Sequence, residues 1–431
     1  MSQTEQNQEN SLILSVRKNL ENFIESINCL RETYGYSVEM LEKQREKANK
    51  VHAAFISKFV TKEKEGSICV PIEKIRQFES VKKTYHRAEK AFSLIPPTYI
   101  VSLISIYDSF YAGLVRSVYQ LKPGILCNCE KAFLYRDLQN FEVLSEVKAC
   151  IIDDTIEGLL RDSHTKQIDW LEKVLDIKTL KQFEGWGNFI ELTERRNLFV
   201  HSDGIVSSQY LSECSKWNVS VGDLSLGAKL SVDRDYFNAA YKLLYAMAIK
   251  LSVILINKLY VEAFKKDEAV RDTLIINSVY ELICDELYDV AIDVSQFALG
   301  SVFKRNAIDR IYIVLNLAQS YKWSGQQDKC LQLLQSEDTT TWKYELIIIK
   351  LTLEERYDEV YDKMKSQGNN GEILKKECYR EWPIFKLIRQ EEEFALVFEE
   401  IFSEKLIDDS SIIEVNKPEP EIENSISITG D

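Results

Sequence analysis

The stretch TYIVSLISIYDSFYAGLVRSVYQL, residues 98–121, is apolar on nearly every face when it is drawn as a helix. A helix of this kind is expected at the centre of a bundle, where neighbouring helices cover all of its sides. It follows Pro96-Pro97, and because proline lacks an amide hydrogen and restricts the residue before it, we expect the preceding helix to end there. One conspicuous acidic residue, Asp108, lies in the apolar middle of the stretch.

The composition of the whole chain agrees with a helical protein. Only 15 Gly and 7 Pro occur among 431 residues, while Leu, Ile, Glu and Lys recur at spacings of three and four. These are the spacings of a helix with one buried side, so we predict an all-α fold. With 45% hydrophobic residues the chain can bury a large core, and its length suggests a soluble globular protein of two or three domains.

Four regions follow from the composition along the chain. Residues 1–95 read as long amphipathic helices, with a break at the charged run near Gly66. Residues 96–264 read as a helical bundle, and residues 266–405 read as short helical pairs. The tail, 406–431, is acidic and has little bulk, so we expect it to be disordered.

The helical pairs of 266–405 resemble one another. Aligning Ala291, Cys330, Val360 and Ala395 gives irregular intervals close to the repeat length of tetratricopeptide-type helical hairpins. Such hairpins bury their faces only by stacking, so a stacked array is expected. An ordinary helical bundle without a regular stack is the alternative.

Charge narrows the classes of function. The formal net charge is -14, so a broad surface for nucleic acid is excluded and any site for a polyanion must be local. The polar N-terminus does not read as a secretory signal, and no apolar run reads as a membrane span, since Lys250 interrupts the best candidate.

Cysteine usage points to a reducing compartment. The nine cysteines are scattered and odd in number, which suits reduced thiols in a cytoplasmic protein. Cys127 and Cys129 form one close pair, but a single pair cannot complete a four-ligand metal site. We therefore predict half-buried thiols there and no metal site.

A second bundle helix contains the motif ELTERRNLFVHSDG, residues 191–204. Arg196 projects from the same stripe as Leu192 and Phe199, and a guanidinium that cannot lose its proton must be paired in such a place. The lone acidic residue Asp108 is the expected partner. Arg195 points about 100° away and is expected to tolerate substitution.

The end of this helix gathers further polar groups. Asn197 and His201 are four residues apart and share a face beside Arg196. The run from His201 to Gly204 predicts that the helix ends there, and the carbonyl end of a helix favours a positively charged group such as an imidazolium. The other histidines, at positions 52, 86 and 164, are expected at the surface without partners.

The segment Arg196-Asn197-Leu198-Phe199-Val200-His201 resembles the signature of HEPN domains, an arginine followed by a polar residue and then, after four to six intervening positions, a histidine. The sequences SLISIYDSFYAGLV, HSDGIVSSQYL and KLSVDRDYFNAAYKLL also resemble stretches of bacterial members. The resemblance covers residues 96–264. It implies a helical bundle and, in active members, a ribonuclease that needs no metal or other cofactor. Two copies of the domain dimerise, so that their arginines and histidines form one composite site.

Function follows as an expectation from this resemblance. We expect a metal-independent endoribonuclease, a toxin or anti-phage defence effector, with Arg196, Asn197 and His201 as catalytic residues and Asp108 in support. The expected partners are RNA, with tRNA as one candidate, a second copy of the chain, and a protein or antitoxin bound by the helical pairs. The alternative is a non-catalytic interaction scaffold, since fold and function separate easily. Nucleotide transfer to a partner lacks a supporting glycine-rich or paired-acid motif.

Overall fold

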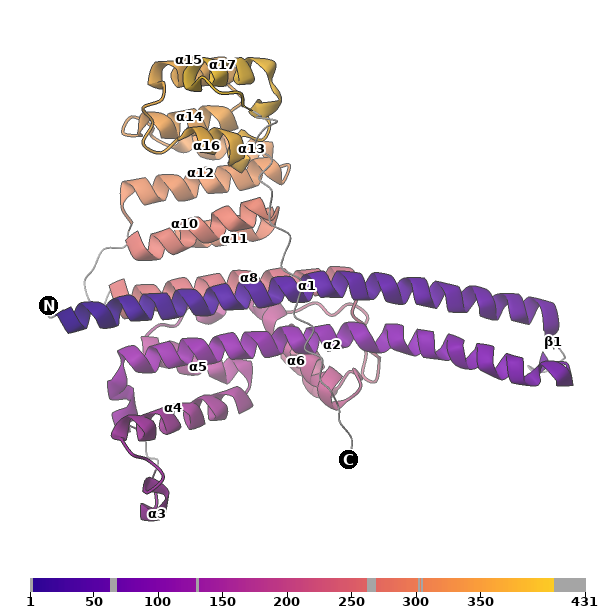
Figure 1. Ribbon diagram of the computed structural model, residues 1–431. Coiled ribbons are helices and arrows are strands. Elements are labelled where there is room, and N and C mark those ends of the chain that lie inside the picture. Colours follow the sequence, from indigo (N-terminus) through magenta and orange to yellow (C-terminus); the bar gives the residue numbers. More distant parts are fainter. Residues whose placement is uncertain are drawn as a thin grey trace, which may run out of the picture. The chain divides into compact units, whose positions relative to one another are not determined.

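The computed structural model describes residues 3–62, 68–128, 132–261, 269–300, 303 and 305–406 (Figure 1). The predicted all-α class is confirmed: helices make up nearly all of the described chain, and its strands β1 (Thr61–Lys62) and β2 (Ile68–Cys69) are two residues each. The chain divides into two compact units, Met1–Asn316 and Leu317–Asp431. Cys129 and the tail from residue 407 onward, on which the sequence made predictions, lie outside the described residues.

The helices of the first unit are α1 (Gln3–Phe59), α2 (Ile75–Leu121), α3 (Tyr135–Leu138), α4 (Leu144–Arg161), α5 (His164–Leu175), α6 (Trp186–His201), α7 (Ser208–Lys216), α8 (Arg234–Ile256), α10 (Ala269–Cys284) and α11 (Tyr288–Leu299). Those beyond are α12 (Ala307–Trp323), which continues across the division, α13 (Gln327–Ser336), α14 (Tyr344–Leu353), α15 (Tyr357–Gln367), α16 (Lys376–Glu381) and α17 (Glu392–Phe402). Single turns of 3₁₀ or π helix lie at Ile72–Lys74, Pro123–Asn128, Leu180–Gln182, Asn257–Val261, Pro383–Phe385 and Ile388–Gln390.

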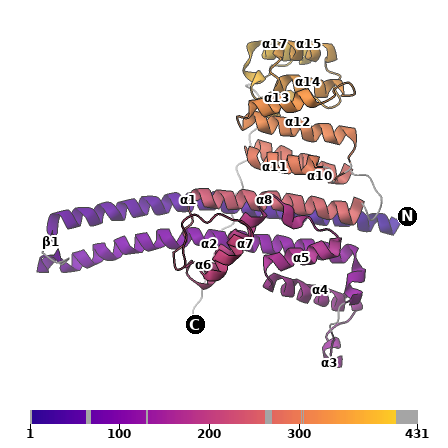
Figure 2. The same ribbon diagram turned by 180° about the vertical axis from the view of Figure 1, so that it is seen from behind.

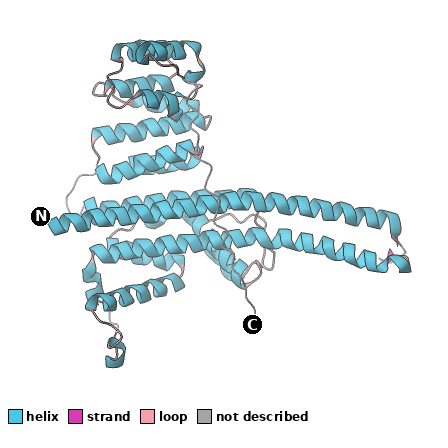
Figure 3. Ribbon diagram, in the orientation of Figure 1, coloured by secondary structure: helices cyan, strands magenta, loops and turns pink. Residues whose placement is uncertain are grey.

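Helices α1 and α2 form a long antiparallel hairpin. Apolar residues of α1 recur at steps of three and four and are buried along the seam, as in a coiled coil; they include Val16, Leu20, Phe23, Ile27, Tyr34, Val38 and Leu41. The strands β1 and β2 pair at the far end of the hairpin (Figure 3). The expected long helices and the break after Phe59 are confirmed.

The expected helix end at Pro96-Pro97 is wrong, because α2 runs through both prolines. The two prolines remove two helical hydrogen bonds. However, α2 packs against α1 both before and after the prolines, and this packing holds the helix together. Before the prolines, Glu89 accepts a hydrogen bond from Arg45 at 2.8 Å, and after them Tyr99 is hydrogen-bonded to Ser37 at 2.6 Å. The boundary at 95/96 therefore does not separate two compact units.

Helices α6 and α8 complete the bundle around α2 and α1. Phe189 of α6 contacts Tyr107 of α2 with ring centroids 5.1 Å apart, and Phe237 of α8 stacks on Tyr34 of α1 at 3.9 Å. Seen from behind, α6 and α7 lie over α2 (Figure 2). Helix α7 follows α6 after six intervening residues.

Two of the described helices are long and apolar enough to cross a membrane, namely Ile72–Leu121 and Arg234–Val261. The sequence reading had found no such segment. Half of the apolar window of the first and 83% of that of the second are buried inside the protein. Core helices of a bundle have this composition because neighbours cover them on all sides.

The expected helical pairs are present as α10 with α11, α12 with α13, and α14 with α15. The aligned residues Ala291, Cys330 and Val360 are each fully buried in the second helix of their pair. The fourth pair differs, because residues 383–390 form two single turns and the short α16 takes the place of the first helix.

The expected boundary at residue 266 also differs from the structure, because α10 and α11 belong to the first unit. Buried charges link them to the bundle. Arg271 of α10 donates to the side-chain oxygen of Asn257 at 2.6 Å, and Lys250 of α8 pairs with Asp293 of α11 at 2.5 Å. Since a buried charge requires a partner, these pairs fix the two helices to the bundle.

Candidate functional site

The predicted motif lies at the C-terminal end of α6. The helix ends at His201 as expected, and the amide groups of Ser202 and Gly204 both donate to the carbonyl oxygen of Leu198. Gly204 has a φ of 73°, and a Cβ atom there would lie 3.0 Å from the ring of Phe199. Glycine is therefore required for the chain to turn back immediately after the motif.

Arg196 is held by two neighbours. Its Nη2 lies 4.0 Å from Oδ2 of Asp108 on α2, and its Nη1 donates to Oδ1 of Asn197 at 3.2 Å. The predicted proximity of Asp108 to Arg196 is confirmed. The Nε atom of Arg196 is buried and has no hydrogen-bond partner among the described residues. Its side chain is 25% exposed, which leaves an approach for a ligand.

Asp108 has a second partner, His164, which the sequence reading had placed at the surface. Nε2 of His164 lies 3.0 Å from Oδ1 of Asp108, and the imidazole is 10% exposed. The ring packs edge-on against Phe189 with centroids 5.6 Å apart. Asp108 therefore links a histidine and an arginine from two different helices.

A sequence signal for His164 existed. Ser163 is the N-cap of α5, and its side chain accepts from the amide of Lys166. Ile168, Leu171 and Leu175 follow His164 at helical spacing and are buried. His164 belongs to their stripe, so its burial could have been predicted from the periodicity.

His201 lies apart from this cluster. It is exposed, and within the described part of the chain it makes no hydrogen bond or ion pair. Five residues along a helix correspond to about 140° of rotation from Arg196. One chain thus brings together Arg196, Asn197, Asp108 and His164, and it presents His201 separately to solvent.

Arg195 belongs to a different, buried network. It pairs with Glu191 at 2.6 Å and donates to the carbonyl oxygen of Ser231 at 3.1 Å. Glu191 also accepts hydrogen bonds from Tyr210 at 2.6 Å and Tyr236 at 2.7 Å. Burial, together with the Glu191 carboxylate, raises the pKa of both tyrosines. The sequence predicts that Arg195 tolerates substitution because it points away from Arg196. That prediction has no physical basis in the structure, because this arginine is a buried structural residue.

A small cleft opens beside His164. Its volume is about 260 Å³, and Glu194, Gln209 and Glu213 line it together with His164. Burial raises the pKa of Glu194, and the neighbouring Glu213 carboxylate adds to the effect. Two lysines, Lys166 and Lys216, also line the cleft, so its two carboxylates are balanced by two cations.

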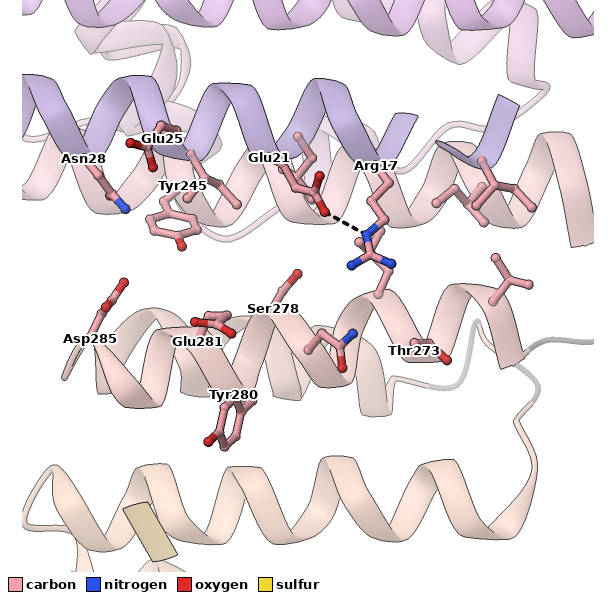
Figure 4. Close-up of a pocket in the computed structure, with 17 residues that line it drawn as sticks. Arg17, Glu21, Glu25, Asn28, Tyr245, Thr273, Ser278, Tyr280, Glu281 and Asp285 are labelled. Atoms are coloured by element: carbon pink, nitrogen blue, oxygen red, sulfur yellow. Dashed lines mark hydrogen bonds and ion pairs between the residues drawn. The ribbon is translucent and has the colours of Figure 1, made fainter. Parts of the chain in front are cut away.

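A larger cavity of about 710 Å³ lies between α1, α8 and α10 (Figure 4). Four carboxylates line it, from Glu21, Glu25, Glu281 and Asp285, and Arg17 in its wall is already paired with Glu21 at 2.7 Å. A polyanion would be repelled there. None of the motif residues contributes to this cavity.

Within the described residues, no group of three or more His, Cys, Asp or Glu side chains is placed to hold a metal ion. A comparison of the chain with family models, with curated proteins and with solved structures found no match.

Proposed function

We propose that the chain is a metal-independent endoribonuclease whose site is completed by a second copy. The observation that carries the proposal is the state of Arg196: its guanidinium is oriented by Asp108 and Asn197, and its side chain remains partly exposed. A planar, permanently charged group held in this way suits phosphate oxygens, which it binds through paired hydrogen bonds.

The chemistry needs few groups. RNA can be cleaved when its own 2′-hydroxyl attacks the adjacent phosphorus, which requires proton transfer and stabilisation of the added negative charge. His201 is the proposed general base or acid, and Arg196 is the proposed charge stabiliser. Asn197 orients the guanidinium by accepting its hydrogen bond. Asp108 neutralises only part of the charge, because it is shared with His164.

A second copy supplies what one chain lacks. His201 is turned about 140° from Arg196 on α6, so the imidazole of one chain does not sit beside its own guanidinium. Two helices α6 facing each other would place two arginines and two exposed histidines at one junction. The protein should therefore sediment as a dimer, and an active monomer at micromolar concentration would contradict a composite site.

The test uses total RNA and a tRNA pool with the purified full chain in EDTA. The expected result is cleavage that leaves 2′,3′-cyclic phosphate ends and is lost in the His201→Ala and Arg196→Lys variants. Matched controls are His86→Ala and Arg161→Lys, both at exposed positions outside the motif. Cleavage that needs added metal, or that persists in His201→Ala, would refute the proposal.

A second candidate is a non-catalytic scaffold, favoured by the helical pairs α12 to α15, which resemble tetratricopeptide-type arrays in their buried anchor residues. Stacked helical pairs offer an extended surface to a protein partner. In the ribonuclease proposal the whole chain is a cytoplasmic toxin or defence effector. Its helical pairs then bind a protein such as an antitoxin. Absence of any cleavage by the wild-type dimer would favour the scaffold.

A further inference from the structure

Basic residues are concentrated in one part of this acidic chain. Residues 43–90 contain thirteen Lys and Arg against six Asp and Glu, whereas the rest of the chain contains forty-one against sixty-two. We call residues 43–90 the basic arm. Its positive charge is local, within a protein that otherwise repels polyanions.

The basic arm is about the distal third of the α1–α2 hairpin. The ion pair of Glu42 with Arg234 at 3.0 Å links the hairpin to α8 just before the basic arm begins. Within the arm the two helices pack on each other, through pairs such as Arg45 with Glu89 and the stacked rings of His52 and Tyr85. Their ends near β1 extend past α6 and α8 in both views (Figures 1 and 2).

The α2 side of the arm carries a basic stripe, which consists of Arg76, Lys83, Arg87 and Lys90 and is interrupted by the exposed Glu79 between the first two. At 100° per residue these four positions fall within about 60° of one another on the helix. All four are exposed, and within the described residues none of them has an acidic partner within ion-pair distance. On α1, by contrast, Lys43 and Lys50 are paired with Glu39 and Glu46.

The stripe leads toward the motif. Asp108 lies eighteen residues after Lys90 on α2, which is five complete turns, so both project from the same face of one helix. Near the end of α6, the hydrogen bond from Lys229 and the charge of Lys90 both lower the pKa of Asp203. Asp203 is two residues beyond His201, so the near end of the stripe is close to the end of α6.

We propose that the basic stripe binds the phosphate backbone of a folded RNA whose cleavable segment lies at the α6 site. The inference rests on the proposed ribonuclease function and specifies its substrate class. From Arg76 to Asp108 the helix spans about 48 Å, which exceeds the reach of a short oligonucleotide and matches an RNA stem of about 16 base pairs. Lysine and arginine bind phosphates without reading sequence, so the stripe positions the RNA rather than selecting a base.

An anionic lipid surface is the competing partner class. Ile68, Ile72 and Ile75 are exposed near the tip of the arm and would suit a membrane. The four cations, however, follow the side of α2 toward the motif for about 21 Å rather than gathering around the tip. A long straight row of charges matches a nucleic acid stem, and lipid binding is therefore tested as an outcome.

The test compares the full chain with a stripe variant that combines Arg76→Gln, Lys83→Gln, Arg87→Gln and Lys90→Gln. The control variant removes four exposed lysines elsewhere, at positions 18, 148, 173 and 178, by the same change to Gln. The probe is a labelled RNA hairpin with a stem of about 16 base pairs, its binding measured by fluorescence anisotropy over a range of salt concentrations. We expect the stripe variant to bind at least about tenfold more weakly, with a salt slope lower by up to about 4, and the control variant to bind like the wild type.

The outcomes separate this inference from the proposed function. Equal binding by the stripe variant, in a protein that cleaves RNA, overturns the stripe and leaves the ribonuclease intact. Stripe-dependent binding without any cleavage supports the stripe and overturns the ribonuclease. Stripe-dependent binding to phosphatidylserine vesicles but not to the hairpin overturns the RNA assignment. If the stripe variant fails to fold by circular dichroism, the pair Lys83→Gln with Arg87→Gln repeats the test at half the charge change.

Discussion

Arg195 and Arg196 are neighbours in sequence but belong to two different polar clusters. Arg195 meets Glu191, a backbone carbonyl and the ring of Tyr236, over which its guanidinium carbon lies at 4.0 Å. Arg196 has a carboxylate at 4.0 Å, one amide oxygen and an unpartnered Nε. A saturated cluster has little capacity left for a ligand, so its contribution is to stability. The Arg196 cluster is less saturated and its guanidinium is partly exposed, so it can meet a ligand, at some cost in stability.

The largest effect expected from this comparison is on folding. Arg195→Ala would leave the Glu191 carboxylate buried without its cation, which costs about 3–5 kcal/mol of unfolding free energy. Urea unfolding of the full chain measures it. Arg161→Ala is the matched control, because that side chain is 80% exposed and its pair contributes about 0.5 kcal/mol or less. A cost for Arg196→Ala as large as that for Arg195→Ala would remove the distinction between the clusters.

The next effect concerns catalysis. Arg196→Lys keeps a positive charge near Asp108 but loses the planar pair of donors, so we expect cleavage of RNA to fall about 10²–10³-fold. The melting temperature should change little, because the side chain is partly exposed and its pairing is incomplete. Rates measured at saturating RNA, beside thermal unfolding, separate the two quantities. If the Arg196→Lys variant cleaved RNA as fast as the wild type, a point charge would be sufficient for catalysis.

The sequence predicted Asp108 beside Arg196 because each projects from an apolar stripe of its helix, where a charge must pair. It missed His164, whose partner lies 56 residues earlier in the chain. It misjudged Arg195 for the same reason, since Tyr236 and Ser231 approach it only in the folded bundle. Helix positions and buried stripes follow from local periodicity, whereas the partners of polar groups depend on tertiary packing.

In the fold, too, some features follow from local spacing and others depend on tertiary packing. The long helices and the helical pairs follow from spacing alone, but the continuity of α2 through Pro96-Pro97 does not. A proline penalty of about 3 kcal/mol is outweighed when a neighbouring helix packs along the whole length. The assignment of α10 to the first unit likewise depends on Arg271 and Asn257, which are joined only in three dimensions.

A smaller effect is expected at Asp108. Asp108→Asn removes the charge shared by Arg196 and His164 but keeps the shape and one acceptor, so we expect a loss of about 1–2 kcal/mol of unfolding free energy. The Asp108 side chain is 20% exposed and its distance to Arg196 is 4.0 Å, and both facts reduce the cost below that at Arg195. Asp153→Asn, at a 58% exposed position, serves as the control. If Asp108→Asn does not change the free energy of unfolding in urea, the guanidinium of Arg196 is stabilised by solvent rather than by this carboxylate.

The smallest effect is expected at Glu194, the residue of α6 directly before Arg195, which lines the cleft beside His164. Burial and Glu213 raise the pKa of Glu194 above its ordinary value of 4.5. The folded chain therefore holds this proton more tightly than the unfolded chain, and the contribution of the group to stability is lost as pH rises from about 4.5 through the raised pKa. Glutamine cannot ionise, so Glu194→Gln should be more stable than the wild type at neutral pH, by about 0.5 kcal/mol. Below the ordinary pKa the two proteins should unfold at the same urea concentration. A stabilisation that is constant with pH would mean that the gain comes from packing or from the contact with Gln209 at 3.4 Å, and not from the removal of a buried charge.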